Sequence, residues 1–305
     1  MKVLIAGDTG LLGQALTEHF LPEHAVAGFS SSPAVKSAPG YTHSVLDLLP
    51  SIAPAEKLIQ SFSPDLVINC TGLVDVKRCE EAKDLARYMN AELPGVLSGI
   101  CASRNIKFIH ISTDQVFDGK KNTPYQESDS PAPTNQYGVT KLAGETNTLK
   151  VNQRALVLRT NIVGWRGRAA APVFAEWLSE NLAARNPISL ADDFVTSSIH
   201  VDFFCRILRE FYTKGGLGVF HAAAKNAVSK YEFGRLFAEA ADLDFSHVRV
   251  VKLAQLGLQP PRPPYLALNV NAAQKFLGSD FPSCEETISL LARQFLRMRG
   301  AVRGI

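Results

Sequence analysis

The sequence has few of the features that mark secreted, membrane-spanning or metal-binding proteins. Its 305 residues include five cysteines, an odd number without a CxxC pair. This argues against a disulfide framework and against a zinc site, and it fits a reducing compartment. No apolar run reaches the ~18 residues of a membrane span, and the apolar N-terminal run at 2–6 is too short for a signal peptide. We therefore expect a cytoplasmic protein without a membrane partner.

An excess of charge of one sign is also missing. The chain has 32 Lys and Arg against 29 Asp and Glu, which gives a formal net charge of +3 without a block of like charges. Proteins that bind nucleic acid usually carry a concentrated basic stripe, so no nucleic-acid partner is expected. The seven histidines show no metal-ligand spacing, so no metal is expected either.

The first half of the chain alternates short apolar runs with helical patterns. The expected strands are at 2–6, 25–29, 44–46, 66–69, 107–112 and 154–160, and the expected helices are at 11–20, 55–62, 82–102 (interrupted near Pro94) and 135–151. Alternation at this spacing is typical of βαβ units with helices on both faces of a parallel sheet. The predicted fold class is therefore α/β, a Rossmann-type doubly wound parallel sheet.

The pattern changes after residue 160. Helical stretches at 172–184, 201–213, 230–241 and 285–299 are separated by proline-bearing loops, most densely at 259–264. We interpret residues 1–160, with 198–224 returning to them, as an NAD(P)-binding Rossmann domain. Residues 161–197 and 225–305 would then form a smaller C-terminal substrate-binding lobe. The alternative is one continuous domain with an irregular end.

Three glycines follow the first expected strand and open the first expected helix. Gly7, Gly10 and Gly13 have GxxGxxG spacing. Glycine permits a tight turn and a close backbone approach, and the helix N-terminus offers free N–H groups to a pyrophosphate. Together with Thr9, Leu11 and Leu12, they form the predicted cofactor-binding loop. The alternative is a structural turn without a phosphate.

The second expected strand ends without the acidic residue that usually holds the ribose 2′-hydroxyl of NAD. It continues into Ser30, with Lys36 close behind. Small hydroxyls and a cation tolerate the 2′-phosphate of NADP, so NADP(H) is favoured over NAD(H). Asp47, after the third strand, is a candidate acceptor for the adenine amino group. A plain solvent loop and a capping role are the respective alternatives.

Tyr137 and Lys141 lie four residues apart on an expected helix, which places both side chains on one face. A free tyrosine has a pKa near ~10. A lysine one turn away, with the positive nicotinamide ring, would favour the phenolate and permit proton exchange near neutral pH. Thr113 ends a strand at the edge where ligands bind in open α/β sheets, and its hydroxyl could hold the same substrate oxygen.

These motifs together resemble the extended short-chain dehydrogenases/reductases, and more closely the dTDP-4-dehydrorhamnose reductase family. The matching segments are 64–69 (PDLVIN), 112–119 (STDQVFDG), 125–133 (YQESDSPAP), 137–145 (YGVTKLAGE), Arg159–Thr160, Arg262–Pro263 and 266–269. The resemblance covers essentially the whole chain. It implies reduction of a 4-keto group on a nucleotide-linked 6-deoxysugar with NADPH or NADH, and a homodimer, as is frequent in the family.

The resemblance also implies roles for individual residues. Thr113, Tyr137 and Lys141 would be catalytic. Cofactor contacts would include Cys70, Thr71, Gly72, Asn90 and Lys141, and substrate contacts would include Asp114, Gln115, Val116, Asn161 and Arg262. Arg262 would bind the sugar-nucleotide phosphates, since arginine offers a bidentate donor fork. Its alternative is a solvated loop arginine.

One departure from the family pattern bears on the reaction. The family's tyrosine after STD is Gln115 here, so the sugar could differ. Sister dehydratases carry an Asp-Glu pair at this place, and the amide of Gln115 cannot act as the base of water elimination. Two alternatives stay open: a sugar-nucleotide epimerase, and a non-catalytic NADP-binding regulatory subunit resembling the beta subunit of methionine adenosyltransferase.

Overall fold

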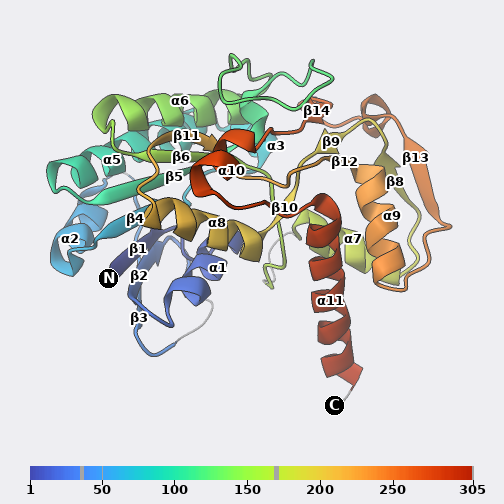
Figure 1. Ribbon diagram of the computed structural model, residues 1–305, viewed down its shortest axis with the longest axis horizontal. Coiled ribbons are helices and arrows are strands. Elements are labelled where there is room, and N and C mark those ends of the chain that lie inside the picture. Colours follow the sequence, from blue (N-terminus) through green and yellow to red (C-terminus); the bar gives the residue numbers. More distant parts are fainter. Residues whose placement is uncertain (35–37, 50, 168–171, 304–305) are drawn as a thin grey trace.

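A computed structural model describes residues 1–34, 38–49, 51–167 and 172–303, with the side chains of 301–303 left out. Its centre is a parallel sheet (Figure 1). Within the described residues the strand order is β3 (Tyr41–Val45), β2 (Ala25–Ser30), β1 (Lys2–Ala6), β4 (Leu66–Asn69), β5 (Lys107–Thr113), β6 (Leu156–Thr160) and β11 (Gly218–His221). The order reverses between β1 and β4, which is the Rossmann-type arrangement expected from the sequence.

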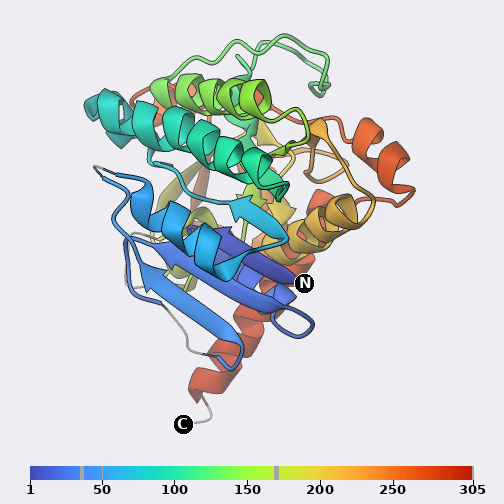
Figure 2. The same ribbon diagram turned by 90° about the vertical axis from the view of Figure 1, so that its left-hand side faces the viewer.

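Alternation of apolar residues along the strands builds a core on each face of this sheet. In β1, Val3 and Ile5 pack with helices α1 (Leu11–Phe20) and α8 (Val201–Thr213), whereas Leu4 and Ala6 pack with α2 (Ala53–Phe62) and α5 (Leu93–Ser103). Helix α6 (Gln136–Val151) lies beside α5. Figure 2 shows α5 and α6 on one side of the sheet, with α8 on the other.

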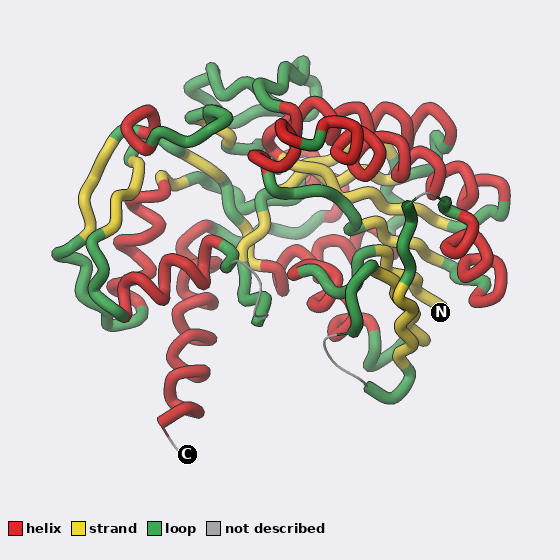
Figure 3. Tube along the Cα trace, turned by 180° about the vertical axis from the view of Figure 1, so that it is seen from behind, coloured by secondary structure: helices red, strands yellow, loops and turns green. Residues whose placement is uncertain are grey.

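The remaining part of the chain has a second hydrophobic core. It is built by α7 (Phe174–Ala183), β8 (Ile188–Ala191), α9 (Lys230–Ala240) and α11 (Cys284–Arg303), with β13 (Val248–Val251) paired to β8. Figure 3 shows these elements at the end of the molecule away from the N-terminus. Three short strands pair with one another between the two cores. They are β9 (Val195–Thr196), β12 (Val228–Ser229) and β14 (Tyr265–Leu266). After β14, α10 (Asn271–Leu277) returns to pack on β11.

Most expected elements occur, with some changes of boundary and type. Strand β3 begins at Tyr41, three residues before the expected start. The expected break near Pro94 takes the form of a π-helical turn at Tyr88–Glu92, which precedes α5 and follows α4 (Lys83–Arg87). Pro94 itself lies in the first turn of α5, where its missing N–H costs no helical hydrogen bond. Among the described helices, none is long and apolar enough to cross a membrane.

Candidate active site

Two adjoining cavities lie at the carboxyl ends of the central strands. Their volumes are ≈ 360 Å³ and ≈ 410 Å³. Both are lined by Gly7, Gly10, Cys70, Thr71 and Gly72, so they form one elongated cleft. This is the place where open α/β sheets bind ligands, and the combined size suits a dinucleotide with a substrate beside it.

The glycine loop forms the floor of the cleft between the two cavities. A Cβ atom on Gly13 would lie 2.2 Å from the Gly7 carbonyl oxygen, so only glycine lets α1 start this close to the loop. Gly10 is the N-cap residue of α1, and it has no side chain that could accept a hydrogen bond from the first turn of the helix. The first N–H groups of α1 are therefore available to an anion, and the loop fits a pyrophosphate.

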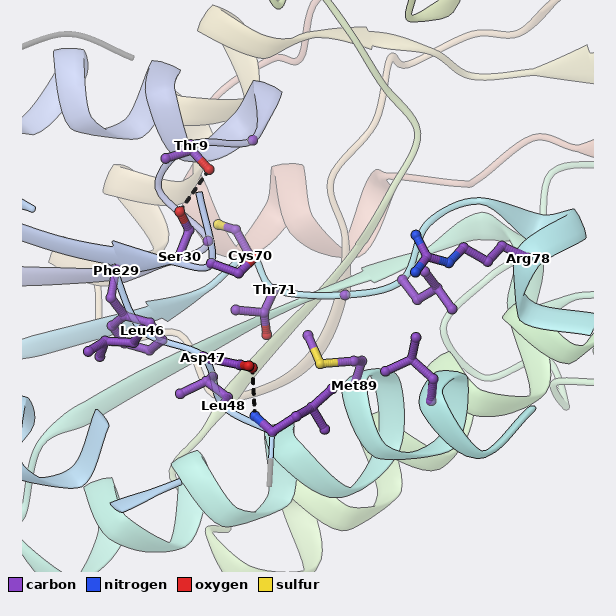
Figure 4. Close-up of a pocket in the computed structure, with 17 residues that line it drawn as sticks. Thr9, Phe29, Ser30, Leu46, Asp47, Leu48, Cys70, Thr71, Arg78 and Met89 are labelled. Atoms are coloured by element: carbon purple, nitrogen blue, oxygen red, sulfur yellow. Dashed lines mark hydrogen bonds between the residues drawn. The ribbon is translucent and has the colours of Figure 1, made fainter. Parts of the chain in front are cut away.

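The first cavity has the character of an adenosine site. Figure 4 shows Thr9, Ser30, Asp47 and Thr71 around it, with Met89 closing one side. The Thr9 hydroxyl donates to Ser30 Oγ at 2.9 Å, which ties the glycine loop to the end of β2. Asp47 is exposed, and its carboxylate accepts the Leu49 N–H at 2.9 Å. Lys36, which the sequence argument placed here, lies outside the described residues.

The second cavity holds the three residues expected to be catalytic. Thr113 ends β5, while Tyr137 and Lys141 come from one face of α6, and all three are buried. The N-terminus of α6 is fixed by Asn135, whose Oδ1 accepts the Gly138 N–H at 2.9 Å. Lys141 Nζ donates to the Ile111 carbonyl at 2.5 Å. The fold therefore gathers a hydroxyl, a phenol and an ammonium around one cavity.

Burial dominates the electrostatics of this group. It raises the pKa of Tyr137, an effect that the neighbouring Thr113 hydroxyl partly offsets. The sequence argument expected Lys141 to lower the pKa of Tyr137, and in this structure the net direction is the opposite. The charge of Lys141 is itself destabilised, because burial lowers the pKa of the lysine to about 8 against the opposing charge of Glu145. The phenol of Tyr137 therefore stays protonated over the neutral range in this structure.

A chain of hydrogen-bonded polar side chains connects Thr113 with Lys230 of α9. The Thr113 hydroxyl donates to Asp114 Oδ1 at 3.0 Å, and Asn161 Nδ2 donates to Asp114 Oδ2 at 2.6 Å. Ser198 Oγ donates to Asn161 Oδ1 at 2.8 Å and accepts from Lys230 Nζ at 3.4 Å. Burial raises the pKa of Asp114 to about 6 and lowers that of Lys230 to about 8. Residues from well-separated parts of the sequence thus position the Asp114 carboxyl group next to Thr113.

Most of the predicted site residues line this cleft. The first cavity is lined by Gly7, Thr9, Gly10, Ser30, Asp47, Cys70, Thr71 and Gly72. The second adds Leu11, Leu12, Gly13, Thr113, Asp114, Gln115, Tyr137, Lys141 and Asn161. Three predicted residues, Asn90, Val116 and Arg262, lie elsewhere.

Asn90 lies behind the cleft wall in the π-helical turn and is fully buried. Its Oδ1 accepts the Leu73 N–H at 2.8 Å, and its Nδ2 donates to the Leu73 carbonyl at 3.0 Å and to Thr140 Oγ1 at 3.1 Å. It therefore connects the loop after β4 to α6. This matches a supporting position more closely than the direct cofactor contact expected from the sequence.

Val116 and Arg262 lie outside the cavity walls for different reasons. The Val116 side chain is fully buried in the hydrophobic core on the α1 face, so its apolar character serves packing. Arg262 donates from Nη1 to the Pro260 carbonyl at 2.7 Å within its own loop, and burial lowers its pKa while Asp75 opposes this effect. Neither residue lines the two cavities, so the substrate contacts expected for them stay predictions.

Several residues that line the first cavity were not identified from the sequence. They are Phe29, Leu46, Leu48, Leu49, Leu73, Arg78, Leu85 and Met89. Arg78 belongs to a short helix, α3 (Val76–Glu81), that was not expected. The available signal was Asp75, whose carboxylate caps this helix by accepting the Arg78 N–H at 3.0 Å. In the sequence, an apolar side chain at a strand end looks the same whether it contacts adenine or packs in the core.

Among the side chains that the structure describes, no group of three or more His, Cys, Asp or Glu is arranged to hold a metal ion.

Known proteins resemble this chain over nearly its full length. The family model for the RmlD substrate binding domain matches residues 1–297. A probable low-salt glycan biosynthesis reductase, Agl14 of Haloferax volcanii, is 32% identical over 299 residues, which cover 97% of this chain and 98% of that protein. Methionine adenosyltransferase 2 subunit beta of Pongo abelii is 33% identical over 271 residues, with 86% and 78% covered. The dTDP-4-dehydrorhamnose reductase of Mycolicibacterium smegmatis is 30% identical over 274 residues, with 88% and 78% covered.

The solved structures agree on the fold. The crystal structure of dTDP-4-dehydrorhamnose reductase from Bacillus anthracis in complex with NADP superposes with a TM-score of 0.85. The match covers 96% of this chain and 99% of that chain at 24% identity.

Proposed function

The chain belongs to the RmlD substrate binding domain family, and on that premise we propose that it is an NAD(P)H-dependent reductase of a 4-keto group on a nucleotide-linked 6-deoxysugar. The observation that carries this proposal is the meeting of Thr113, Tyr137 and Lys141 at one end of a cleft whose other end is a glycine loop. Similarity to dTDP-4-dehydrorhamnose reductases over most of the chain supports the same reaction class.

The described residues fit a nicotinamide dinucleotide on physical grounds. The close packing at Gly13 and the free N–H groups of α1 suit its pyrophosphate, and the Ser30 end of the first cavity suits its adenosine. When bound, the reduced nicotinamide supplies the hydride. NADP(H) is the proposed preference over NAD(H), since β2 ends in Ser30 without a carboxylate.

Each of the three catalytic candidates has a separate task in this proposal. The Thr113 hydroxyl, which donates to Asp114 Oδ1 in this structure, would turn to donate to the carbonyl oxygen of the bound substrate and hold it. Tyr137, kept protonated by burial, donates its phenolic proton to that oxygen as hydride reaches the carbon. Lys141 places a positive charge one helical turn away, which stabilises the phenolate left on Tyr137. Bulk solvent then restores the proton.

The remaining assignments follow the shape of the cleft. Asp114, Gln115 and Asn161 line the second cavity beside Thr113 and are proposed to contact the sugar. We propose that residues 1–160 with 198–224 bind the cofactor, and that 161–197 with 225–305 bind the substrate. The homodimer stays a prediction that sedimentation analysis of the purified protein would test.

The reductase proposal is tested by NADPH consumption with a panel of nucleotide-linked 4-keto-6-deoxysugars, including dTDP-4-dehydrorhamnose. One NADPH oxidised per sugar reduced is the expected stoichiometry. An epimerase would convert the sugar without net NADPH consumption, which would contradict the proposal.

A second candidate is a regulatory subunit, because methionine adenosyltransferase 2 subunit beta is similar to this chain over 271 residues. Three results together would favour this candidate. The purified protein would bind NADPH, it would form a stable complex with a methionine adenosyltransferase catalytic subunit, and it would leave every sugar in the panel unchanged. Turnover of any sugar in the panel that consumes NADPH and depends on Tyr137 would favour the reductase.

A further inference from the structure

A buried acidic residue in the glycine loop reaches across the sheet to the end strand. Asp8 follows β1 and is 2% exposed, yet its Oδ2 accepts the Tyr41 O–H at 2.5 Å and contacts His43 Nδ1 at 2.7 Å. Tyr41 and His43 belong to β3, and β2 runs between them and the loop. The side chain of Asp8 therefore crosses over β2.

The crossing is possible because of the residue beneath it. Ile5, Gly28 and His43 are paired in register across β1, β2 and β3. A Cβ atom on Gly28 would lie 2.0 Å from Asp8 Oδ2 and 2.5 Å from Asp8 Cβ. Glycine at this position leaves the gap through which the carboxylate reaches His43.

His43 has an acceptor oxygen at each of its ring nitrogens. Its Nδ1 lies 2.7 Å from the Asp8 carboxylate, and its Nε2 lies 3.0 Å from the Ser32 carbonyl oxygen. Carboxylate and carbonyl oxygens only accept, so both contacts are hydrogen bonds only when both ring nitrogens carry a proton. A ring with a proton on each nitrogen is an imidazolium, which would compensate a buried carboxylate charge.

The same ring holds the turn that closes the adenosine end of the cleft. The Ser32 carbonyl accepts from His43 and also from Ser30 Oγ at 2.8 Å, and Ser30 Oγ accepts from Thr9 at 2.9 Å. Ser30 and Ser31 line the first cavity. In Rossmann folds the 2′ group of the adenosine ribose lies at this strand end.

We propose that His43 carries a proton on both ring nitrogens in the folded protein and, as an imidazolium, makes this strand end accept a 2′-phosphate, which makes it a specificity-determining residue. The proposal rests on the dinucleotide binding proposed above and deepens it. Without the imidazolium, the Asp8 carboxylate would stand uncompensated next to the Ser30–Ser32 turn and would repel the 2′-phosphate of NADPH. NADH, which carries a hydroxyl there, would be little affected.

The test compares the two cofactors in paired variants. Titration calorimetry with NADPH and NADH is carried out on the wild type, on His43→Gln and on the double variant Asp8→Asn/His43→Gln. We expect His43→Gln to lower the preference for NADPH over NADH by about tenfold, because one uncompensated negative charge faces a phosphate in a partly screened site. The double variant removes both charges and should recover the preference.

The cofactor ratio separates this role from a structural one, since a distorted fold would weaken both cofactors alike. An unchanged ratio in His43→Gln, or no recovery in the double variant, would overturn the inference. A wild type that binds neither cofactor would instead overturn the proposed function.

The charge of the ring is also measurable without any substitution. Nitrogen NMR of the histidine-labelled wild type distinguishes a ring with two N–H groups from a ring with one. Two N–H groups on His43 at neutral pH are expected, and a single N–H would overturn the inference even if the variants failed to fold.

Discussion

Glu145 of α6 and Arg159 of β6 form a bidentate ion pair that is almost fully withdrawn from solvent. Arg159 Nε donates to Glu145 Oε1 at 2.9 Å, and Nη2 donates to Oε2 at 2.7 Å. Their side chains are 5% and 4% exposed. Ser112 Oγ donates to Glu145 Oε1 at 2.5 Å. The pair therefore anchors the helix that carries Tyr137 and Lys141 to two strands of the sheet.

Breaking this pair should be costly. Glu145→Gln leaves the Arg159 guanidinium buried without a counter-charge, and we expect a loss of about 3–5 kcal/mol in the free energy of unfolding. The double variant Glu145→Leu/Arg159→Met, which buries no charge, should lose less than the single variant. Urea denaturation followed by circular dichroism measures both.

The matched control is the exposed pair of Glu232 and Arg235 on α9, whose side chains are 39% and 44% exposed. Glu232→Gln should cost less than about 1 kcal/mol, because water screens the charges. Equal losses at the two sites would contradict the importance assigned to burial.

Removal of one hydroxyl tests the proton donor. Tyr137→Phe should lower kcat by about 10²–10⁴-fold, the usual contribution of a general acid, while NADPH still binds. Tyr231→Phe on α9, outside the cleft, should leave kcat unchanged. Full turnover by Tyr137→Phe would show that another group delivers the proton.

Asp114 should make the stability of the protein depend on pH. Burial raises its pKa in the folded state from 3.8 to about 6, so the folded protein disfavours the ionised carboxyl. The resulting destabilisation is complete above about pH 6 and disappears as the pH falls toward 3.8. We expect Asp114→Asn to gain about 2 kcal/mol relative to the wild type on going from pH 4 to pH 8. Urea titrations at several pH values measure this difference, and a constant difference would contradict the raised pKa.

Lys141 should limit activity in alkaline solution. Burial lowers its pKa to about 8, so the lysine is positive below that pH and neutral above it. Because the positive charge stabilises the phenolate of Tyr137, kcat/KM should fall above about pH 8. Lys141→Arg keeps its charge at all of these pH values and should lose the alkaline limb. An alkaline limb that persists in this variant would have to come from another group.

Gly28 should be intolerant of even one added methyl group. Gly28→Ala places Cβ within 2.5 Å of three Asp8 side-chain atoms, and we expect a loss of about 1–3 kcal/mol. In an Asp8→Gly background the same substitution should cost less, since all three clashing atoms are gone. Gly300→Ala in α11, where an added Cβ meets no atom within 4 Å, should be neutral or stabilising and serves as the control.

The sequence predicted those elements whose pattern had one physical explanation. Strand β4 and helix α8 begin and end at the expected residues, because a short apolar run after Pro64 and a strongly amphipathic stretch allow few alternatives. Strand β3 was shifted because Thr42 and His43 look like loop residues. His43 is a strand residue whose polarity is matched by Asp8, and that partner comes from 35 positions earlier in the chain.

The same distinction applies to the site. Spacing sufficed to bring Tyr137 and Lys141 onto one helical face, since both belong to one local element. Val116 follows a catalytic motif in sequence, yet its side chain turns into the core. Ser198 and Lys230, which extend the chain of hydrogen bonds from Asp114, come from distant segments whose meeting depends on the tertiary fold.

The route of the chain between the two lobes has a consequence for how the molecule assembles. The chain leaves the central sheet after β6, returns to supply α8 and β11, leaves again for α9, and returns once more with α10 before ending in α11. Leu16 and Phe20 of α1 share a core with Phe204 and Leu208 of α8, which are synthesised nearly two hundred residues later. The first 160 residues therefore cannot complete their own core during synthesis. The core around α1 can therefore be completed only after the second half of the chain has been made. We expect the two hydrophobic cores to form and melt as one cooperative unit.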